Sequence, residues 1–179
     1  NDSIYDKDTL FSISCSVDQC QTQVTVTQKE TSSNKLGGLV GDNKGFVTQS
    51  AATGEVQAAS SYMVGGLAGD SSGSIYDCHA EGTVTGYGSV GGFVGSSSGL
   101  IKNSYSLGAV QGAERIGSFG GSLYAVDFVI GAGMVTVTGT STSGYAGGLT
   151  GYLNGTVAGL PNQITVKNAY GNCVQKDDK

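Results

Sequence analysis

The chain has 179 residues, a mass of 18.0 kDa and a formal net charge of −5 at pH 7, and it contains 31 glycines and one proline. Its length favours one domain, and its nine scattered Lys and Arg residues exclude a basic surface for nucleic acid. No run of 18 apolar residues is present, so no membrane-spanning helix is predicted.

Residues 1–34 lack the repeat found in the rest of the chain and are predicted to form a small N-terminal β cap. Residues 10–14 and 23–27 alternate apolar and polar side chains, as strands do. A coil of stacked strands needs a cap because its last strands expose unpaired backbone groups. A hairpin would provide one. Cys15 and Cys20 are close enough in sequence to be candidates for a disulfide within it.

A glycine doublet returns five times in residues 35–179. The copies are Gly37-Gly38-Leu39-Val40-Gly41, Gly65-Gly66-Leu67-Ala68-Gly69, Gly91-Gly92-Phe93-Val94-Gly95, Gly117-Ser118-Phe119-Gly120-Gly121 and Gly147-Gly148-Leu149-Thr150-Gly151. The intervals of 28, 26, 26 and 30 residues are typical of a solenoid. Glycine interrupts every helical window, so the chain is predicted to be all-β. We expect a β-solenoid of about five turns, similar to a parallel β-helix, with three short strands in each turn.

Alignment of the copies predicts columns of side chains that stack inside the coil at about 4.8 Å per turn. The apolar columns are Val47, Ile75, Ile101 and Val166; Leu39, Leu67, Phe93, Phe119 and Leu149; and Val56, Val84, Val110 and either Val135 or Val137. A column of small residues contains Ser50, Cys78, Ser104 and Ala169. The repeated glycines mark corners that need a positive φ or a close backbone approach. The near-regular period disfavours the alternative fold, a β-sandwich.

The third copy resembles the GLUG repeat, with Gly91-Gly92-Phe93-Val94-Gly95 followed by Gly99-Leu100-Ile101-Lys102-Asn103-Ser104-Tyr105 and Gly108-Ala109-Val110. The resemblance extends over residues 35–174, closely in the first three copies, partly in the fifth and weakly in the fourth. GLUG repeats occur in secreted or surface-attached proteins, including adhesins and non-catalytic regions of immunoglobulin-cleaving metallopeptidases. The resemblance therefore implies an extracellular role in adhesion or architecture, and it transfers no catalytic residue.

Catalytic residues, a metal site and a cofactor are not expected. His79 is the one histidine, so a His-Glu-x-x-His motif is absent. Cys78 and His79 are adjacent and would point to opposite faces of a strand, which predicts a buried thiol beside a surface imidazole. The acidic side chains do not cluster as they do in polysaccharide-active β-helix enzymes, so an enzyme of that kind is the least favoured alternative.

Two polar columns have candidate roles outside catalysis. Asp42 and Asp70 occupy equivalent positions, where they are either solvated turn residues or bridged by a calcium ion. Asp77, Asn103 and Asn168 share a second column with Gln49 in the first copy. Side chains of this kind are expected to hydrogen-bond between turns, which favours a structural role over ligand contact.

Six tyrosines are the candidate binding residues. They are Tyr62, Tyr76, Tyr87, Tyr105, Tyr145 and Tyr170. Exposed tyrosines stack on sugars or fill protein interfaces, whereas tyrosines at the edge of a core only pack. A row of tyrosines on one face of the coil would favour binding.

Two functions remain open for a non-enzymatic extracellular protein. One is an adhesin module that binds a host protein or a glycan; the other is a subunit of a filament or coat, built by head-to-tail stacking into a homopolymer. Cys173 lies roughly 14 Å from Cys78 at this turn spacing, so we expect it to be a free thiol or to pair with another chain. The sequons at Asn1 and Asn154 fit an exported protein, and the start at Asn1 fits a mature chain or a fragment.

Overall fold

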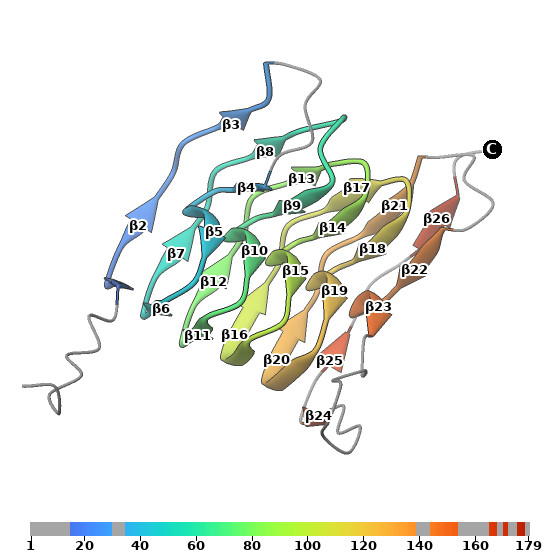
Figure 1. The fold of residues 1–179 in the computed structure, drawn as a ribbon. Helices are drawn as coiled ribbons and strands as arrows, with labels where there is room; N and C mark the ends of the chain where they lie inside the picture. The colour runs from blue at the N-terminus through green and yellow to red at the C-terminus, as the bar shows by residue number, and fades with distance from the viewer. Residues whose placement is uncertain are drawn as a thin grey trace, which may run out of the picture.

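The chain coils into a β-solenoid of about five turns (Figure 1). The structure, a computed structural model, describes residues 15–29, 35–138 and 144–153 and the backbone of three short strands at 165–167, 170–171 and 175–177. These residues form strands and turns without a helix. The predicted all-β solenoid is therefore confirmed.

Four parallel sheets, named A to D here, run along the coil. Sheet A contains β1 (Ser16–Asp18), β2 (Gln21–Thr22), β6 (Phe46–Thr48), β7 (Ala51–Ala52), β11 (Ser74–Tyr76), β12 (His79–Ala80), β16 (Leu100–Ser106), β20 (Ala125–Gly131), β24 (Thr165–Lys167) and β25 (Tyr170–Gly171). Sheet B contains β3 (Val26–Thr27), β8 (Val56–Gln57), β13 (Val84–Thr85), β17 (Val110–Gly112), β21 (Val135–Val137) and β26 (Gln175–Asp177). Sheet C contains β4 (Lys35–Gly37), β9 (Met63–Gly65), β14 (Ser89–Gly91), β18 (Arg115–Gly117) and β22 (Tyr145–Gly147). Sheet D contains β5 (Val40–Asn43), β10 (Ala68–Ser71), β15 (Val94–Ser97), β19 (Gly120–Leu123) and β23 (Thr150–Leu153).

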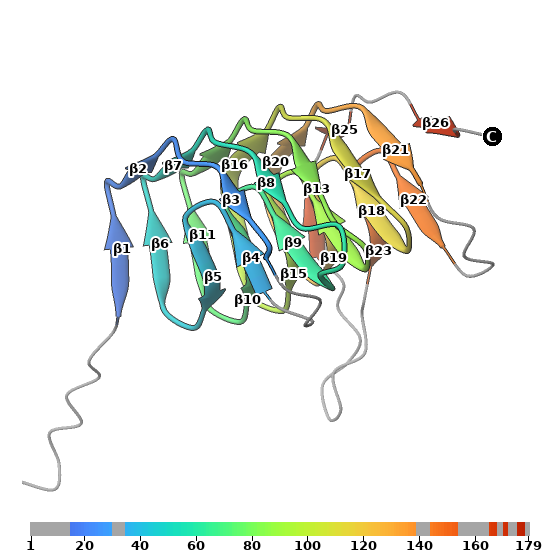
Figure 2. The same cartoon turned by 90° about the horizontal axis from the view of Figure 1, so that it is seen from above.

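A typical turn has five short strands, as in β6 to β10, and not the three that were predicted. Two bends account for the difference. One bend divides sheet A in the first turns, and the glycine doublet separates the strand of sheet C from that of sheet D. Figure 2 shows successive turns as parallel ribs along the rod.

Residues 15–29 form a turn of the solenoid rather than a hairpin. Strands β1, β2 and β3 pair in parallel with β6, β7 and β8. The register places Val17 beside Val47 and Val26 beside Val56, so the segment extends two core columns. Residues 15–29 therefore form a turn of the coil and no hairpin among themselves, and residues 10–14, the other stretch predicted for the cap, lie outside the described residues.

The interior consists of two hydrophobic cores. The first lies between sheets A and D and includes the stacked rings of Phe93 and Phe119, whose centroids are 4.6 Å apart. The second lies between sheets B and C and contains mostly valines. The predicted apolar columns are confirmed, and the register assigns Val135 rather than Val137 as the neighbour of Val110. In the small-residue column Val129 follows Ser104, and Ala169 lies outside the described residues. Val126, which the alignment had not placed, stacks on Ile101.

A narrow waist between the two cores explains the glycine doublet. A Cβ atom on the second glycine of the doublet would lie 3.1 Å from the Cβ atom of Ala52 at Gly38 and 3.0 Å from that of Ala80 at Gly66. It would also meet the carbonyl oxygen of the next turn. Neither Gly38 nor Gly66 has a φ between +20° and +160°. Close approach, and not positive φ, is therefore the reason for the doublet.

The degenerate fourth copy keeps the waist by exchanging its two partners. Ser118 replaces the second glycine of the doublet, and Gly131 replaces the small residue that faces it. A Cβ atom on Gly131 would collide with the hydroxyl oxygen of Ser118. That hydroxyl instead donates a hydrogen bond to the carbonyl oxygen of Gly148. The fourth copy therefore departs from the sequence pattern without departing from the fold.

The positive φ angles lie at the bend in sheet A. They belong to a single column of non-glycine residues, Gln19, Gln49, Asp77, Asn103 and Phe128, with φ between 48° and 55°. In the first turns, the residue after this bend is the predicted small residue. A serine hydroxyl at this position accepts a hydrogen bond from the backbone N–H of the preceding turn. The backbone N–H of Cys20 donates to Ser50 Oγ at 3.0 Å, and that of Cys78 donates to Ser104 Oγ at 3.2 Å.

The amide column at this bend forms hydrogen bonds between turns, as predicted. Asn103 Nδ2 donates to Asp77 Oδ1 at 3.0 Å, and Gln19 Nε2 donates to Gln49 Oε1 at 3.1 Å. Phe128 ends the row, and Asn168 lies outside the described residues. These contacts support the structural interpretation of the column.

Candidate functional site

Sheets C and D meet at the doublet bend, and their outward side chains face each other along a line that we call the seam. The seam residues of sheet C are Lys35, Met63, Ser89, Arg115 and Tyr145. Those of sheet D are Asp42, Asp70, Ser96, Ser122 and Tyr152. The last glycine of each copy closes the seam, because a Cβ atom on Gly69 would lie 2.5 Å from the backbone nitrogen of Leu36.

At the N-terminal end of the seam, a lysine bridges the two stacked carboxylates. Lys35 Nζ lies 3.1 Å from Asp42 Oδ2 and 2.7 Å from Asp70 Oδ2. The hydrogen bond from Lys35 lowers the pKa of Asp42, and the hydrogen bonds to Asp70 and Asp42 raise the pKa of Lys35. Lys44 adds a second contact to Asp42 at 3.6 Å. These lysines take the place that a bridging calcium ion would fill, so the calcium alternative is not supported.

At the C-terminal end of the seam, an arginine and two tyrosines form a cluster. The guanidinium carbon of Arg115 lies 5.1 Å from the ring centroid of Tyr152. The rings of Tyr152 and Tyr145 have centroids 5.8 Å apart and planes inclined at 52°. Both rings are well exposed, 38% for Tyr152 and 50% for Tyr145. Tyr145 was one of the six predicted binding residues, whereas Arg115 and Tyr152 were not predicted.

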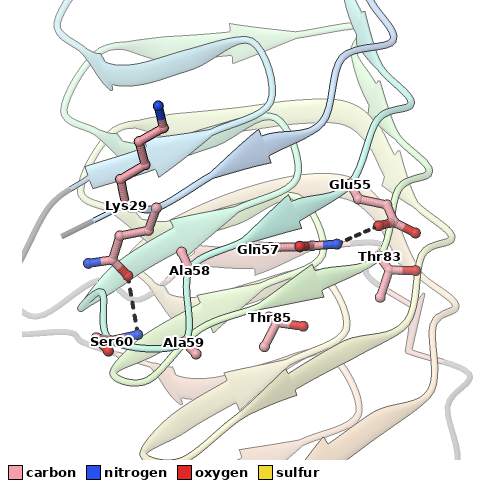
Figure 3. A pocket seen from close by; sticks show the side chains of 9 residues that line it. Lys29, Glu55, Gln57, Ala58, Ala59, Ser60, Thr83 and Thr85 are labelled. Atoms are coloured by element: carbon pink, nitrogen blue, oxygen red, sulfur yellow. Dashed lines mark hydrogen bonds between the residues drawn. The ribbon is translucent and has the colours of Figure 1, made fainter. Parts of the chain in front are cut away.

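A pocket of about 430 Å³ with both polar and apolar lining lies on the outer face of sheet B (Figure 3). It spans three successive turns and is lined by Gln28, Lys29, Glu55, Gln57, Ala58, Ala59, Ser60, Thr83 and Thr85. Gln57 Nε2 donates to Glu55 Oε2 at 2.9 Å, and Gln28 Oε1 accepts from the backbone N–H of Ser60 at 3.2 Å. Both contacts fix side chains on the wall of the pocket.

The chemistry of this pocket suits recognition by hydrogen bonds. Its wall offers amide, hydroxyl and ammonium groups, and Glu55 is its one carboxylate. Hydrolysis of a glycosidic bond usually needs two carboxyl groups placed about 5–9.5 Å apart. No sequence motif distinguishes this pocket, because its residues look like ordinary exposed strand positions. Their alternation with Val56 and Val84 identifies them as outward-facing.

The tyrosines predicted to bind ligand do not form one row. Tyr62 and Tyr87 meet at the corner between sheets B and C, with ring centroids 5.5 Å apart. Tyr76 and Tyr105 lie on sheet A, in different columns. Tyr145 is on the seam, and only the backbone of Tyr170 is described. The structure thus divides them among three surfaces.

Cys78 and His79 point to opposite faces of sheet A, as predicted. Cys78 is 1% exposed, and its burial raises the pKa of the thiol to about 11, so the thiol is protonated at neutral pH. His79 stacks on Tyr105 outside the coil, with ring centroids 4.9 Å apart. The pair therefore lacks the geometry and the protonation state of a nucleophile and its base.

Cys15 and Cys20 are both free and exposed, so the predicted disulfide between them is not formed. Strand β1 lies between the two cysteines and holds their backbones apart. The three extended residues of this strand alone cover roughly 10 Å, and a disulfide requires Cα atoms within about 7 Å. Cys173, Asn1 and Asn154 lie outside the described residues.

Nowhere in the described ranges do three His, Cys, Asp or Glu side chains come together as metal ligands would. The same part of the chain holds no helix with the length and apolar character needed to cross a membrane.

Residues 60–85 match the family model described as the GLUG motif. This stretch runs from the B–C corner to β13 and covers one complete turn. The chain therefore carries a GLUG repeat, which confirms the resemblance inferred from its glycine pattern. The shared register shows that neighbouring turns repeat the same structure as the matched segment. No curated protein and no solved structure gives a significant match to the chain.

Proposed function

We propose that this β-helix-type repeat protein is a non-enzymatic extracellular module that binds glycans, with the pocket on sheet B as a binding site. The observation that carries the proposal is the set of amide and hydroxyl groups from three stacked turns around a volume of about 430 Å³. Groups of this kind match the hydroxyls of a sugar chain. The GLUG repeat and the rigid coil support an extracellular adhesive role.

A neutral-oligosaccharide array followed by titration calorimetry tests the pocket. Gln57→Ala and Thr85→Ala remove two polar groups from its wall and are expected to weaken binding about tenfold each. Thr136→Ala is the matched control, because it changes a threonine on the outer face of the same sheet, outside the pocket. Absence of any glycan ligand, or equal losses in the control variant, would contradict the proposal.

A second candidate function is assembly by stacking of coils. Among the described residues, strands β1, β2 and β3 have a partner along one edge only. Unpaired parallel edges are templates for another chain. Light scattering of native material with and without reductant tests this function. A large assembly would support it, dissociation on reduction would add a disulfide link such as one through Cys173, and a monomer of 18.0 kDa in both conditions would exclude it.

A further inference from the structure

The guanidinium group at the C-terminal end of the seam has no acidic partner among the described residues. Arg115 is the one arginine in the chain, and each of the four ion pairs found in the described residues is formed by a lysine. Its side chain is exposed, and its sheet D neighbours are Ser122 and Tyr152. A guanidinium carries five N–H donors in a planar fork, and that fork fits a carboxylate with two parallel hydrogen bonds.

The two tyrosine rings next to this guanidinium provide an apolar platform. Tyr145 and Tyr152 come from adjacent strands of sheets C and D, and their planes are inclined at 52°. Two inclined, exposed rings present faces on which the C–H groups of a sugar ring can pack. Their hydroxyl groups add hydrogen-bond partners for the hydroxyls of the same sugar.

We propose that Arg115, Tyr145 and Tyr152 form a binding site for a sugar that carries a carboxylate, either a uronic acid or a sialic acid. The guanidinium pairs with the carboxylate, and the rings pack against the pyranose. Ser122 lies in register with Tyr152 and supplies a further hydroxyl beside it. The net charge of −5 repels anions in general, so selection of an acidic sugar depends on this local geometry.

This site is separate from the pocket on sheet B, although both proposals hold that the protein binds glycans. Variants distinguish them. Gln57→Ala changes the pocket alone and is expected to leave binding of the acidic sugar unchanged. Arg115→Gln changes the seam alone and is expected to leave binding of a neutral oligosaccharide to the pocket unchanged. Failure of one proposal therefore leaves the other intact.

The test is titration calorimetry of the full chain with three probes: sialyllactose, a glucuronate-containing oligosaccharide and lactose. Sialyllactose and lactose differ by the acidic sugar alone. We expect at least one acidic probe to bind at least tenfold more tightly than lactose and to weaken as salt is raised. The probe that binds identifies the sugar. Equal affinity for all three probes, or no binding of either acidic probe, would overturn the proposal.

Variants assign the binding to the seam. Arg115→Gln is expected to weaken the acidic probe by about tenfold or more, and Arg115→Lys by less, because a lysine keeps the charge but lacks the fork. Lys44→Gln is the matched control, since it removes the same charge from an exposed side chain outside the cluster. Equal losses in Arg115→Gln and Lys44→Gln would show general electrostatics and overturn the proposal. Thermal melting of each variant excludes unfolding as the cause.

Discussion

The two ends of the seam have the same backbone and different chemistry. Lys35 and Arg115 occupy the same column of sheet C. Lys35 contacts two carboxylates of the facing sheet D column, at 3.1 Å and 2.7 Å. Arg115 meets a tyrosine ring in that facing column instead. One repeated backbone therefore pairs a cation with carboxylates at one end and sets it beside an aromatic ring at the other, depending on the side chains of the facing sheet D column.

The largest expected effect comes from disrupting the close approach of sheets C and D at the last glycine of a copy, which both ends of the seam share. Gly69→Val places a branched side chain within 2.7 Å of backbone atoms of Lys35 and Gly41. We expect a loss of about 3 kcal/mol or more in the free energy of unfolding, because backbone of two strands cannot move aside. Urea unfolding measures it. Ser96→Val, on the outer face of the same sheet, is the control and should cost less than about 1 kcal/mol. If Gly69→Val is as stable to urea as the parent protein, sheets C and D do not approach each other closely at the seam.

The next effect comes from converting one end of the seam into the other. Tyr152→Asp gives Arg115 a carboxylate at the position that Asp42 and Asp70 hold beside Lys35. We expect binding of an acidic sugar to fall by at least about tenfold, because the new carboxylate competes for the guanidinium and the ring is lost. Tyr62→Asp, at an exposed tyrosine elsewhere, controls for the added negative charge. Calorimetry with sialyllactose and with a glucuronate-containing oligosaccharide measures the affinity of both variants. Unchanged affinity in Tyr152→Asp would show that Arg115 and the Tyr152 ring do not bind the sugar.

A smaller effect is expected from Lys35→Gln, which removes the internal cation. The pKa of Asp42 lies below its ordinary 3.8, so its contribution to stability is present above about pH 4 and is lost as pH falls through the lowered value. The pKa of Lys35 lies above its ordinary 10.5, so its contribution is present below that pH and is lost as pH rises through the raised value.

The variant should therefore be slightly less stable than the parent protein between these limits and equally stable outside them. Both partners are partly exposed, so the difference is small. Urea midpoints measured at pH 7 and in series toward acid and toward alkaline pH test the prediction. Lys29→Gln, which removes the same charge from an exposed lysine outside this cluster, is the control. A difference that does not shrink as the pH falls through the lowered pKa of Asp42 would show that the ion pairs are not its source.

The smallest effect is expected from Tyr145→Phe. The change keeps the ring that packs beside Tyr152 and removes one exposed hydroxyl. We expect the affinity for an acidic sugar to change by about threefold or less, and Tyr145→Ser to cause a larger loss because it removes the ring. Equal losses in the two variants would show that the hydroxyl matters and the ring does not.

The repeat columns were predictable because each depends on one position in every copy. Val47, Ile75 and Ile101 recur at the same place after the doublet, and they stack as expected. The period is read directly from the glycines, and inward side chains follow from strand alternation.

The contacts across the seam were not predictable from the columns alone. The position of Arg115 two residues before the doublet matches that of Lys35 in the sequence. Its contact with Tyr152 depends on how closely sheets C and D approach, which the glycine pattern does not give as a distance. The left-handed backbone of Gln49 and Phe128 was also missed, because neither residue type favours that conformation.

The exchange of Ser118 and Gly131 across the waist has a consequence for how such a rod changes length. The two residues that face each other across each waist belong to a single copy, since Gly66 faces Ala80 and Ser118 faces Gly131. Excision of residues 66–91 would join Gly65 to Gly92 and restore an intact doublet. The length of the rod can therefore change in steps of one whole repeat, because duplication or deletion of a copy leaves the contacts of the remaining turns unchanged.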